Sequence, residues 1–582
     1  MPVSNSDIAD LFDKAASLLE IQAANAFRVR AYRNASRVIR NWPESLASII
    51  RRGSDLPKMP GIGEDLAEKI GEAVRTRNLA LLTQLKRETP EGLVALLRIP
   101  GLGPKRVLLL QKSLGVRSVQ DLEAALNEGR LDEIRGFGPK LEEKIRAELR
   151  RSGPGEPSER KRLALATAEQ IAEPLLFYIK ECANVKQATI AGSYRRRCET
   201  VGDLDLLVSC DDQEAVMKHF LAFEDIDQVV SKGATRSTVI FKSGVQVDLR
   251  AVGEESYGAA LHYFTGSKAH NIHIRSMGVK RGLKINEYGI FRGSRRVGGE
   301  SETDVFKSVG LPYIEPELRE NQGEIEAAAA GRLPDLVRLD QIRGDLHAHS
   351  KATDGRLSIE EMAAAARKLG YEYLSITDHS KRLTVARGLD TRRLSSQLRE
   401  IDRLNEKFSD FRILKSIEVD ILEDGSLDLP DSILSQLDLT VCSVHSHFDL
   451  SARKQIERIL RAMDNPYFNI LGHPTGRLIG QRPAMEFDLE EVMKGAKERG
   501  CALEINAQPE RMDLSDVHCR LAKKIGVMVA ISTDAHSDHD LQFMKFGVSL
   551  ARRGWLERTQ VLNTRSCSEI VRLVRRKGVS AA

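Results

Sequence analysis

Three aspartates carry the strongest chemical signal in the sequence. Asp203 and Asp205 stand at i and i+2, a spacing that places both carboxylates on one face of a β-strand. Asp248 lies in a second strand-like run, VQVDLR (245–250). If the two strands are neighbours, the three carboxylates converge and offer hard oxygen ligands to Mg²⁺ or Mn²⁺. Two such cations can hold the attacking and leaving oxygens of an in-line phosphoryl transfer.

The segment before these aspartates has the composition of a phosphate-binding turn. Gly192 and Ser193 offer backbone N–H groups and a hydroxyl to a triphosphate, and Arg196 can neutralise its charge. A lone Asp-x-Asp is most often a solvated strand end. The glycine, the serine, the arginine cluster and the third aspartate together favour a nucleotide-binding site with catalytic Asp203, Asp205 and Asp248.

Residues 1–315 resemble the family X DNA polymerases, the class that includes DNA polymerase beta. The family pattern G-S-x-R-R-G followed by G-D-x-D is nearly complete, but Arg197 replaces its last glycine and adds bulk and charge near the nucleotide. The stretch YFTGS (263–267) is similar to the family's nucleotide pocket. The resemblance implies an α+β nucleotidyltransferase palm with a thumb, and DNA synthesis from deoxynucleoside triphosphates.

The same resemblance implies roles for residues around the pocket. Tyr263 and Phe264 would pack under the sugar and discriminate against a 2′-hydroxyl, and Asn271 would contact the incoming base. Without the neighbouring Thr-Gly-Ser, the two aromatic residues would be ordinary core residues. The implied nucleotide-binding set is Gly192, Ser193, Arg196, Gly202, Tyr263, Phe264, Gly266 and Asn271. The implied DNA contacts in this region are Arg250 and Arg275.

A second group of metal-ligating residues lies in the C-terminal part of the chain. Its members mostly end short apolar runs such as LSITDH and NILGHP, which alternate with helical patterns. That alternation predicts a parallel (β/α) barrel, whose strand ends meet at one mouth. Imidazole with carboxylate ligands favours Mn²⁺, Zn²⁺ or Fe, and the set suffices for about three ions. The set is His347, His349, Asp354, His379, Glu418, His445, His473, Asp534 and His536.

Residues 340–575 resemble the PHP (polymerase and histidinol phosphatase) family, and every member of this set matches a ligand position of that family. In the family such a cluster hydrolyses phosphoesters, because a cation lowers the pKa of bound water and offsets phosphoryl charge. Some PHP domains attached to polymerases have lost ligands and are structural, but no ligand is missing here. The resemblance therefore implies an active 3′–5′ exonuclease or 3′-end phosphoesterase; a preference for abasic sites or 3′-phosphates stays open.

A G-x-G turn recurs three times in the first 150 residues, each time between two helical segments. The following helix N-terminus offers unpaired N–H groups, which bind phosphate without reading a base. One copy could be a plain helix connector, but three copies resemble helix-hairpin-helix motifs, which bind DNA. The third copy lacks the leading proline and is the weakest. The predicted DNA-binding residues are Gly61, Gly63, Gly101, Gly103, Lys105, Gly136, Gly138 and Lys140.

Lys69 stands where some family X members carry a Schiff-base lysine that removes 5′-deoxyribose phosphate. Such a lysine needs a depressed pKa. The family's companion lysine, four residues earlier, is Asp65 here, which would raise the pKa of Lys69 and repel a 5′-phosphate. A solvated helix lysine is an equal alternative, so we expect weak lyase activity at most.

Composition supports a multidomain chain with real hydrophobic cores. The 582 residues suffice for three or four domains, and 41% hydrophobic with 29% charged residues argue against a disordered protein. No apolar stretch is long enough to span a membrane, and the 7 cysteines form no CxxC pair, which favours the cytoplasm. The net charge of +5 resides wholly in residues 1–150, where 25 Lys+Arg face 20 Asp+Glu. That excess is weak evidence for a polyanionic partner.

The expected fold class is multidomain, α and α/β. The expected divisions are a lyase-like helical domain (1–85), a fingers-type helical domain (86–160), the palm (161–260), the thumb (261–320), a linker (321–340) and the PHP barrel (341–582). The combined prediction is a monomeric bacterial family X DNA polymerase that fills short gaps in DNA repair and processes 3′ ends. The chief alternative is a DNA end-processing nuclease with an inactive polymerase core. A DNA-binding scaffold without either activity would need only the hairpins.

Overall fold

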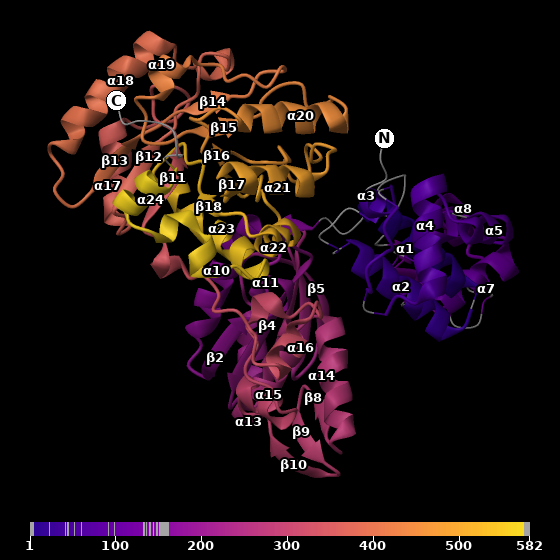
Figure 1. Ribbon diagram of the computed structural model, residues 1–582. Coiled ribbons are helices and arrows are strands. Elements are labelled where there is room, and N and C mark those ends of the chain that lie inside the picture. The colour runs from indigo at the N-terminus through magenta and orange to yellow at the C-terminus, as the bar shows by residue number, and fades with distance from the viewer. Residues whose placement is uncertain are drawn as a thin grey trace. The chain divides into compact units, whose positions relative to one another are not determined.

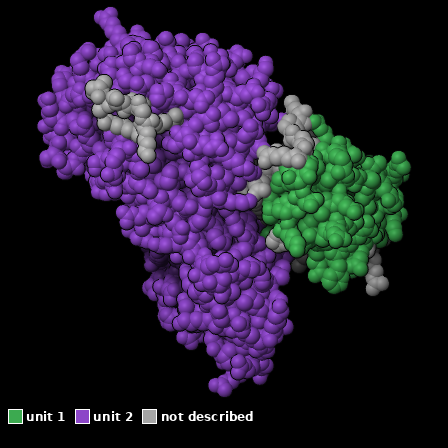
Figure 2. Space-filling view, in the orientation of Figure 1, with its two compact units in different colours: residues 1–161 green, residues 162–582 purple. Residues whose placement is uncertain are grey.

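The computed structural model describes residues 5–574 except 23, 41, 43–45, 52, 60, 91, 98, 100, 132–133, 135–136, 139–140, 144, 147–148 and 150–161. The chain divides into two compact units, residues 1–161 and 162–582 (Figure 2), and each is described by itself. None of the helices in the described ranges has the length and apolar character that a membrane crossing requires.

Unit 1 is helical. Apolar residues at helical spacing form two cores, one around Phe12 and Tyr32 and one around Leu96 and Val107. Its described helices are α1 (Asn5–Ile21), α2 (Ala26–Arg40), α3 (Leu46–Arg51), α4 (Glu64–Thr76), α5 (Ala80–Glu88), α6 (Gly92–Leu96), α7 (Pro104–Leu114) and α8 (Val119–Asn127).

Unit 2 begins with a five-stranded sheet in the order β2-β4-β7-β6-β5 (Figure 1). The pair β4 and β7 is parallel and the other pairs are antiparallel. The elements are β1 (Leu163–Ala164), α10 (Leu165–Lys180), β2 (Val185–Ile190), α11 (Gly192–Arg195), β3 (Thr200–Val201), β4 (Asp203–Cys210), α12 (Gln213–Phe220), β5 (Ile226–Lys232), β6 (Arg236–Phe241) and β7 (Gln246–Val252).

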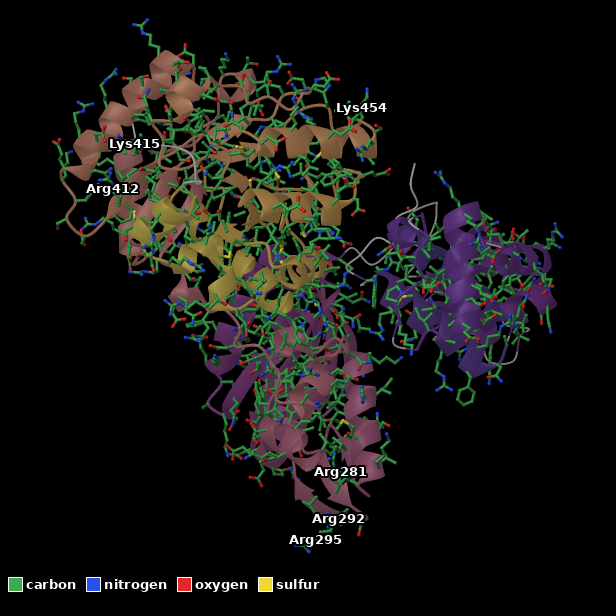
Figure 3. The ribbon with its side chains drawn as sticks, viewed as in Figure 1. Arg281, Arg292, Arg295, Arg412, Lys415 and Lys454 are labelled. Atoms are coloured by element: carbon green, nitrogen blue, oxygen red, sulfur yellow. The ribbon has the colours of Figure 1, made fainter. Side chains whose placement is uncertain are left out.

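A smaller α+β region follows, with a three-stranded antiparallel sheet. The exposed Arg292 and Arg295 flank the turn between its strands β9 and β10 (Figure 3). The expected linker, 321–340, is not free chain, because Ile325 and Ala328 are buried in the core that also contains Phe306. The elements are α13 (Glu254–Thr265), α14 (Lys268–Lys280), β8 (Lys284–Asn286), β9 (Gly289–Arg292), β10 (Arg295–Gly298), α15 (Glu302–Ser308), the 3₁₀ helix η1 (Pro316–Leu318) and α16 (Glu324–Ala329).

The C-terminal region contains parallel strands in two sheets, β11-β12-β13 and β14-β15-β16-β17-β18. Their residues are almost all buried, as in parallel sheets covered on both faces. Isolated parallel bridges, Ala348 to Ala535 and His379 to Glu418, join the two sheets. The expected parallel barrel architecture is therefore present, with isolated bridges rather than continuous ladders at both junctions. Helices such as α17, α18, α20 and α21 lie outside the strands (Figure 1).

The elements are η2 (Leu339–Gln341), β11 (Gly344–Ala348), α17 (Ile359–Lys368), β12 (Tyr373–Ile376), η3 (Thr384–Ala386), α18 (Thr391–Asn405), β13 (Arg412–Lys415), β14 (Glu418–Asp420), α19 (Asp431–Leu434), β15 (Val441–Ser443), α20 (Ala452–Met463), β16 (Ile470–Leu471), α21 (Leu489–Arg499), β17 (Ala502–Asn506), α22 (Asp516–Ile525), β18 (Val529–Ser532), η4 (Asp540–Phe543), α23 (Met544–Arg553), η5 (Arg558–Gln560), η6 (Leu562–Thr564) and α24 (Cys567–Val574).

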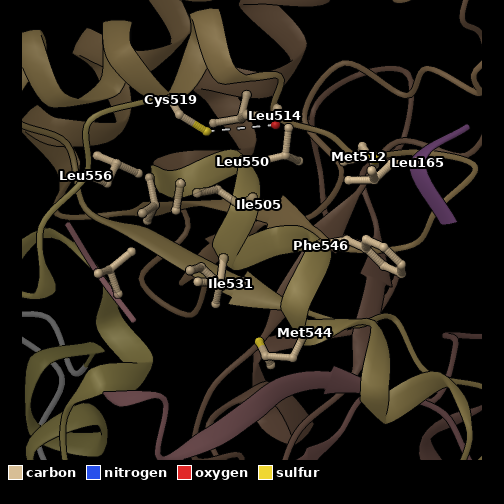
Figure 4. Packing of buried hydrophobic residues seen from close by; sticks show 14 of the residues in the cluster. Leu165, Ile505, Met512, Leu514, Cys519, Ile531, Met544, Phe546, Leu550 and Leu556 are labelled. Atoms are coloured by element: carbon tan, nitrogen blue, oxygen red, sulfur yellow. Dashed lines mark hydrogen bonds between the residues drawn. The ribbon is translucent and has the colours of Figure 1, made fainter. Parts of the chain in front are cut away.

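One cluster of buried apolar side chains joins the five-stranded sheet region to the barrel. It includes Leu165 of α10 together with Met512, Ile531 and Phe546 of the barrel. Figure 4 shows Leu165 beside Met512, with side chains of α23 packed over Ile505 and Ile531. Because burying apolar surface drives this association, the two regions form a continuous core within unit 2.

Candidate active sites

The three predicted aspartates converge on two neighbouring strands. Asp205 of β4 is the direct register partner of Asp248 of β7, and Asp203 lies two residues earlier on β4. Neighbouring strands are about 4.8 Å apart, so the carboxylates share one small region. Burial, followed by the charges of Asp203 and Asp248, raises the pKa of Asp205 to about 7. Like charges gathered in this way fit a site for divalent cations.

Three donors that the sequence analysis did not single out hold Asp248. Thr238 Oγ1 and Arg236 Nη2 donate to Oδ1 at 2.5 and 2.9 Å, and Gln246 Nε2 donates to Oδ2 at 2.7 Å. Burial acts to raise the pKa of Asp248, but these hydrogen bonds outweigh it and lower the pKa. The period-two pattern of β6 and β7 could have identified them, since Arg236 and Thr238 alternate toward the face that carries Asp248.

The turn before β4 brings backbone close to the carboxylates. Gly192 has φ of +62°, and a Cβ there would lie 2.6 Å from Oδ2 of Asp205, so only glycine fits. Ser193 follows in the short helix α11. Arg196 donates from Nε to Glu320 Oε1 at 2.9 Å and from Nη1 to the Thr265 carbonyl at 2.8 Å. Its charge acts to lower the pKa of Asp205, against the stronger effects of burial and the neighbouring aspartates.

The side chain of Arg197, which was expected to add bulk and charge near the nucleotide, is bound by other residues of the fold. The residue has φ of +56°, a left-handed conformation that redirects the chain. Its Nη1 lies 3.2 Å from Glu169, its Nε donates to Ser549 Oγ at 3.1 Å, and its guanidinium lies over Phe546. Arg197 therefore pairs with Glu169, and its side chain contacts the barrel helix α23.

The predicted pocket residues lie together at the end of α13. The rings of Tyr263 and Phe264 meet edge to face with centroids 5.1 Å apart, and both residues are only half-buried, unlike core aromatics. Arg250 lies over Phe264 at 4.4 Å. Asn271 Nδ2 donates to the Tyr263 carbonyl at 2.6 Å, and a Cβ at Gly266 would lie 2.6 Å from Asn271 Oδ1.

Two other predicted positions lie apart from this group. Gly202 directly precedes β4, and a Cβ there would lie 3.2 Å from Arg162 Nη1. Arg275 is exposed on α14, where it is available to a partner.

A buried ion network supports the turn from behind. Arg195 binds both oxygens of Glu302, with Nη1 at 2.9 Å and Nη2 at 2.7 Å, and Arg319 Nη1 donates to Glu302 Oε1 at 2.6 Å. Burial acts to raise the pKa of Glu302, but the two arginines outweigh it and lower the pKa to about 2. The network ties α11 to α15, and the sequence contains no local signal for it.

Replacing Glu302 by glutamine should lower the free energy of unfolding at pH 7 by about 3–5 kcal/mol, because two arginines would remain buried without their anion. The folded-state pKa lies below the ordinary 4.5, so the unfolded protein takes up this proton first as the pH falls. The loss in the free energy of unfolding should therefore stay constant above about pH 5 and shrink as the pH falls from 4.5 toward 2. Urea unfolding of both proteins across this range measures it. An undiminished deficit at the acid end would contradict the role of this charge.

The barrel mouth brings together the whole predicted set of metal ligands. Three overlapping groups have ligand atoms within 4.8 Å of one another: His349, Asp354, His379 and His536; His347, His349 and Asp534; and His379, Glu418 and His445. His473 joins them, since its Nε2 lies 2.9 Å from Glu418 Oε1. Each of these residues lies in a barrel strand or in the loop after one, so the parallel topology explains the convergence.

The chemistry of this cluster fits divalent cations. His349 Nδ1 is buried without a hydrogen-bond partner, and His379 Nδ1 lies 2.8 Å from Glu418 Oε2. Burial and the neighbouring His379 and His536 lower the pKa of His349 to about 3, which keeps the imidazole in its neutral, metal-binding form. Burial acts to raise the pKa of Glu418, but surrounding imidazoles outweigh it and lower the pKa.

Two carboxylates that the sequence analysis missed orient these imidazoles. Glu504 Oε1 lies 2.7 Å from His347 Nδ1, and Asp420 Oδ1 lies 2.5 Å from His445 Nδ1. Such partners fix the ring orientation and raise the basicity of a metal-binding histidine. The available signal was a carboxylate inside a strongly apolar strand, as in CALEINA for Glu504.

The glycine turns of unit 1 share one hydrogen-bond pattern. The residue between the two glycines donates its N–H to the carbonyl three residues earlier: Ile62 to Met59, Leu102 to Ile99 and Phe137 to Ile134. Gly63 and Gly103 cap α4 and α7 without a side-chain acceptor, which leaves the helix N–H groups available. Gly61 and Gly101 have positive φ, Lys105 and Gly138 are exposed, and Gly136 and Lys140 lie outside the described residues.

Lys69 is paired as the sequence indicated. Its Nζ contacts Oδ1 of Asp65, one turn earlier on α4. Burial acts to lower the pKa of Lys69, but the bond to Asp65 outweighs it and the pKa is raised. A protonated lysine is a poor nucleophile toward an aldehyde.

Models of known protein families match most of the chain. They are described as helix-hairpin-helix domain (residues 3–79), SAM-like helix-hairpin-helix tandem (93–151), DNA polymerase beta palm (164–255), DNA polymerase beta thumb (260–320) and PHP domain (345–508).

Individual relatives match either the whole chain or its C-terminal part. A Bacillus subtilis (strain 168) protein named DNA polymerase/3′-5′ exonuclease PolX is 39% identical over 577 residues, which is 98% of this chain and 99% of that protein. A probable phosphatase of Thermoanaerobacter sp. (strain X514) is 32% identical over 231 residues, 38% of this chain and 89% of the phosphatase. A probable phosphatase of Caldicellulosiruptor bescii is 29% identical over 206 residues, 34% of this chain and 81% of that protein.

Proposed function

Because this chain belongs to the family X DNA polymerases that carry a C-terminal PHP domain, as the sequence resemblance predicted, we propose that it fills short gaps in DNA and trims 3′ ends. Its substrates are gapped or primed DNA and deoxynucleoside triphosphates. The observation that carries the proposal is the convergence of Asp203, Asp205 and Asp248 beside the Gly192 turn.

At the polymerase centre the three aspartates would hold Mg²⁺ or Mn²⁺. Such cations lower the pKa of a primer hydroxyl and offset phosphate charge. Arg196 would neutralise the triphosphate, with Gly192 and Ser193 offering donors to it. Asp248 is the proposed acceptor of the primer proton, because it would lie nearest the incoming strand. Asn271 would exchange its bond to the Tyr263 carbonyl for the incoming base.

At the PHP centre the histidine and carboxylate set would hold about three ions of Mn²⁺, Zn²⁺ or Fe. Bound cations supply activated water and charge neutralisation for hydrolysis of the terminal phosphodiester. Glu504 and Asp420 would hold the rings of His347 and His445 in position. The proposed product is a DNA strand shortened in the 3′ to 5′ direction.

A labelled primer in a gapped duplex tests both activities in one reaction. With Mg²⁺ or Mn²⁺ and all four deoxynucleoside triphosphates, we expect extension to the end of the gap. Without nucleotides we expect shortening, and a chelator should stop both. Shortening without extension under either cation would leave the alternative, an end-processing nuclease with an inactive polymerase core. Salt-sensitive binding without either reaction would indicate a scaffold.

The PHP centre has a second candidate substrate, a 3′-phosphate. Relatives named probable phosphatases match this part of the chain alone, which favours phosphomonoester hydrolysis. Primers that end in a hydroxyl, a phosphate or an abasic sugar, compared at equal concentration, separate these preferences. Faster release of inorganic phosphate than of nucleotides would favour the phosphatase.

Lyase activity at Lys69 should be weak, because Asp65 keeps the lysine protonated. Borohydride trapping on DNA with a 5′-deoxyribose phosphate should give little covalent adduct, and Lys69→Ala should remove what forms. Replacing Asp65 by lysine, which restores the family's second cation and removes the paired acid, should increase trapping. An adduct that survives Lys69→Ala would assign the chemistry to another amine.

We also propose that the protein acts as a monomer in the cytoplasm. Its seven cysteines are free thiols, which suits a reducing compartment. Sedimentation with and without gapped DNA measures the oligomeric state.

A further inference from the structure

The barrel contributes a guanidinium that reaches the back of the nucleotide turn. Arg553, the last residue of α23, is 9% exposed and is held on one side by Asp516 of α22, with Nε at 2.8 Å and Nη2 at 2.7 Å. Its Nη1 crosses to the palm and donates to the Arg196 carbonyl at 2.9 Å and to Glu320 Oε1 at 3.1 Å.

The same carboxylate oxygen binds the side chain of Arg196. Glu320 Oε1 accepts from Arg196 Nε at 2.9 Å, so one oxygen lies between the two guanidinium groups. Burial acts to raise the pKa of Glu320, but Arg553 and Arg196 outweigh it and lower the pKa. Arg553 thus contacts both the backbone of Arg196 and the anion that orients its side chain.

A second contact from the same helix fixes the next residue of the turn. Ser549 of α23 accepts from Arg197 Nε, and Phe546 lies under the Arg197 guanidinium. Lys545 adds an ion pair at 2.7 Å to Glu169, the carboxylate that also pairs with Arg197. Helix α23 therefore contacts the turn at two successive residues, Arg196 through Arg553 and Arg197 through Ser549.

We propose that Arg553 of the PHP domain is a positioning residue of the polymerase site: it holds Arg196 in place for the triphosphate of the incoming nucleotide. This proposal rests on the role of Arg196 in the proposed function. A planar guanidinium with fixed donor directions can serve Asp516, Glu320 and a carbonyl together, but a lysine ammonium cannot reproduce that geometry.

Gap filling by the full-length protein, with the concentration of one complementary deoxynucleoside triphosphate varied, tests the proposal. Arg553→Met should raise KM for the nucleotide about tenfold or more, with a smaller change in kcat, because a displaced Arg196 binds the triphosphate less well. Arg553→Lys should recover part of the loss. The 3′–5′ exonuclease rate of the same preparations should stay unchanged, which reports that the barrel is folded.

The matched control is Arg552→Met. This substitution removes the same charge from the same helix. The Nε of Arg552 binds Glu317 at 2.6 Å, however, and the residue contacts neither Arg196 nor Glu320. The KM of Arg552→Met should stay within about twofold of wild type, since the partners of Arg552 are Glu317 and the Val337 carbonyl rather than residues of the nucleotide turn. In an Arg196→Met background, Arg553→Met should have no further effect on KM, because the two residues act as one unit.

The outcomes separate this inference from the proposed function. If Arg196→Met raises KM but Arg553→Met does not, the positioning role is overturned and the polymerase proposal stands. If Arg196→Met leaves KM unchanged, the role of Arg196 at the triphosphate fails, and the positioning role with it. If Arg553→Met loses exonuclease activity through misfolding, Glu320→Gln, which perturbs the same link from the thumb side, should still raise KM. An unchanged KM for Glu320→Gln would also overturn the proposal.

Discussion

Replacing Asp205 by asparagine should reduce primer extension on gapped DNA by at least about a thousandfold, equivalent to about 4 kcal/mol of transition-state stabilisation. Asp205 is the half-buried central member of the triad, the direct register partner of Asp248 and close to Gly192. Asparagine keeps the shape but removes the negative charge that a shared cation site needs. Single-turnover extension with saturating Mg²⁺ or Mn²⁺ measures the loss.

The control for this variant is Asp211→Asn, an exposed aspartate directly after β4 that pairs with Lys186 at the surface. It should extend primers at the wild-type rate. The Asp205→Asn protein should still shorten 3′ ends, since the PHP ligands come from other strands. Retained extension by Asp205→Asn, within about tenfold of wild type, would remove the triad from the chemistry.

Replacing His349 by alanine should reduce 3′–5′ hydrolysis by about a hundredfold or more while leaving primer extension intact. His349 belongs to two of the three ligand groups, so its loss weakens more than one ion site. Metal analysis of the purified variant should show fewer bound ions per chain than wild type. If the imidazole is a metal ligand, the hydrolysis rate and the number of bound ions should both decrease.

His539→Ala is the matched control, because His539 is an exposed imidazole close in sequence to Asp534 and His536 but outside the cluster. Hydrolysis and metal content should match wild type. A His349→Ala protein that keeps its metal content and hydrolyses DNA normally would show that His349 is not a required ligand.

The convergence of both sites could be predicted from the sequence because each depends on strand periodicity and parallel topology. Asp203 and Asp205 share a face by spacing alone, and barrel strand ends meet at one mouth whatever the loop lengths. The glycine turns could be predicted for a similar reason, since Gly61 and Gly101 occupy positive φ in a repeated local pattern.

Other features followed from no local pattern. The side chain of Arg197 was expected near the nucleotide, yet a left-handed backbone turns it toward Glu169 and Ser549. The segment 321–340 was expected as a linker, yet Ile325 and Ala328 are buried. Both outcomes depend on which distant surface happens to cover the residue, and that surface is not encoded by neighbouring positions.

By itself, the sequence determined which residues could bind cations and phosphate, because side-chain chemistry and strand or turn spacing are local properties. Only the tertiary structure decided which carboxylates orient which imidazole rings, as Glu504 does for His347. It also decided which guanidinium group, that of Arg553, supports the nucleotide turn. Arg553 and Arg196 are 357 residues apart in the chain, yet Nη1 of Arg553 lies 2.9 Å from the carbonyl oxygen of Arg196. Hydrogen bonds and ion pairs act over a few ångströms in space and carry no mark at such separations in sequence.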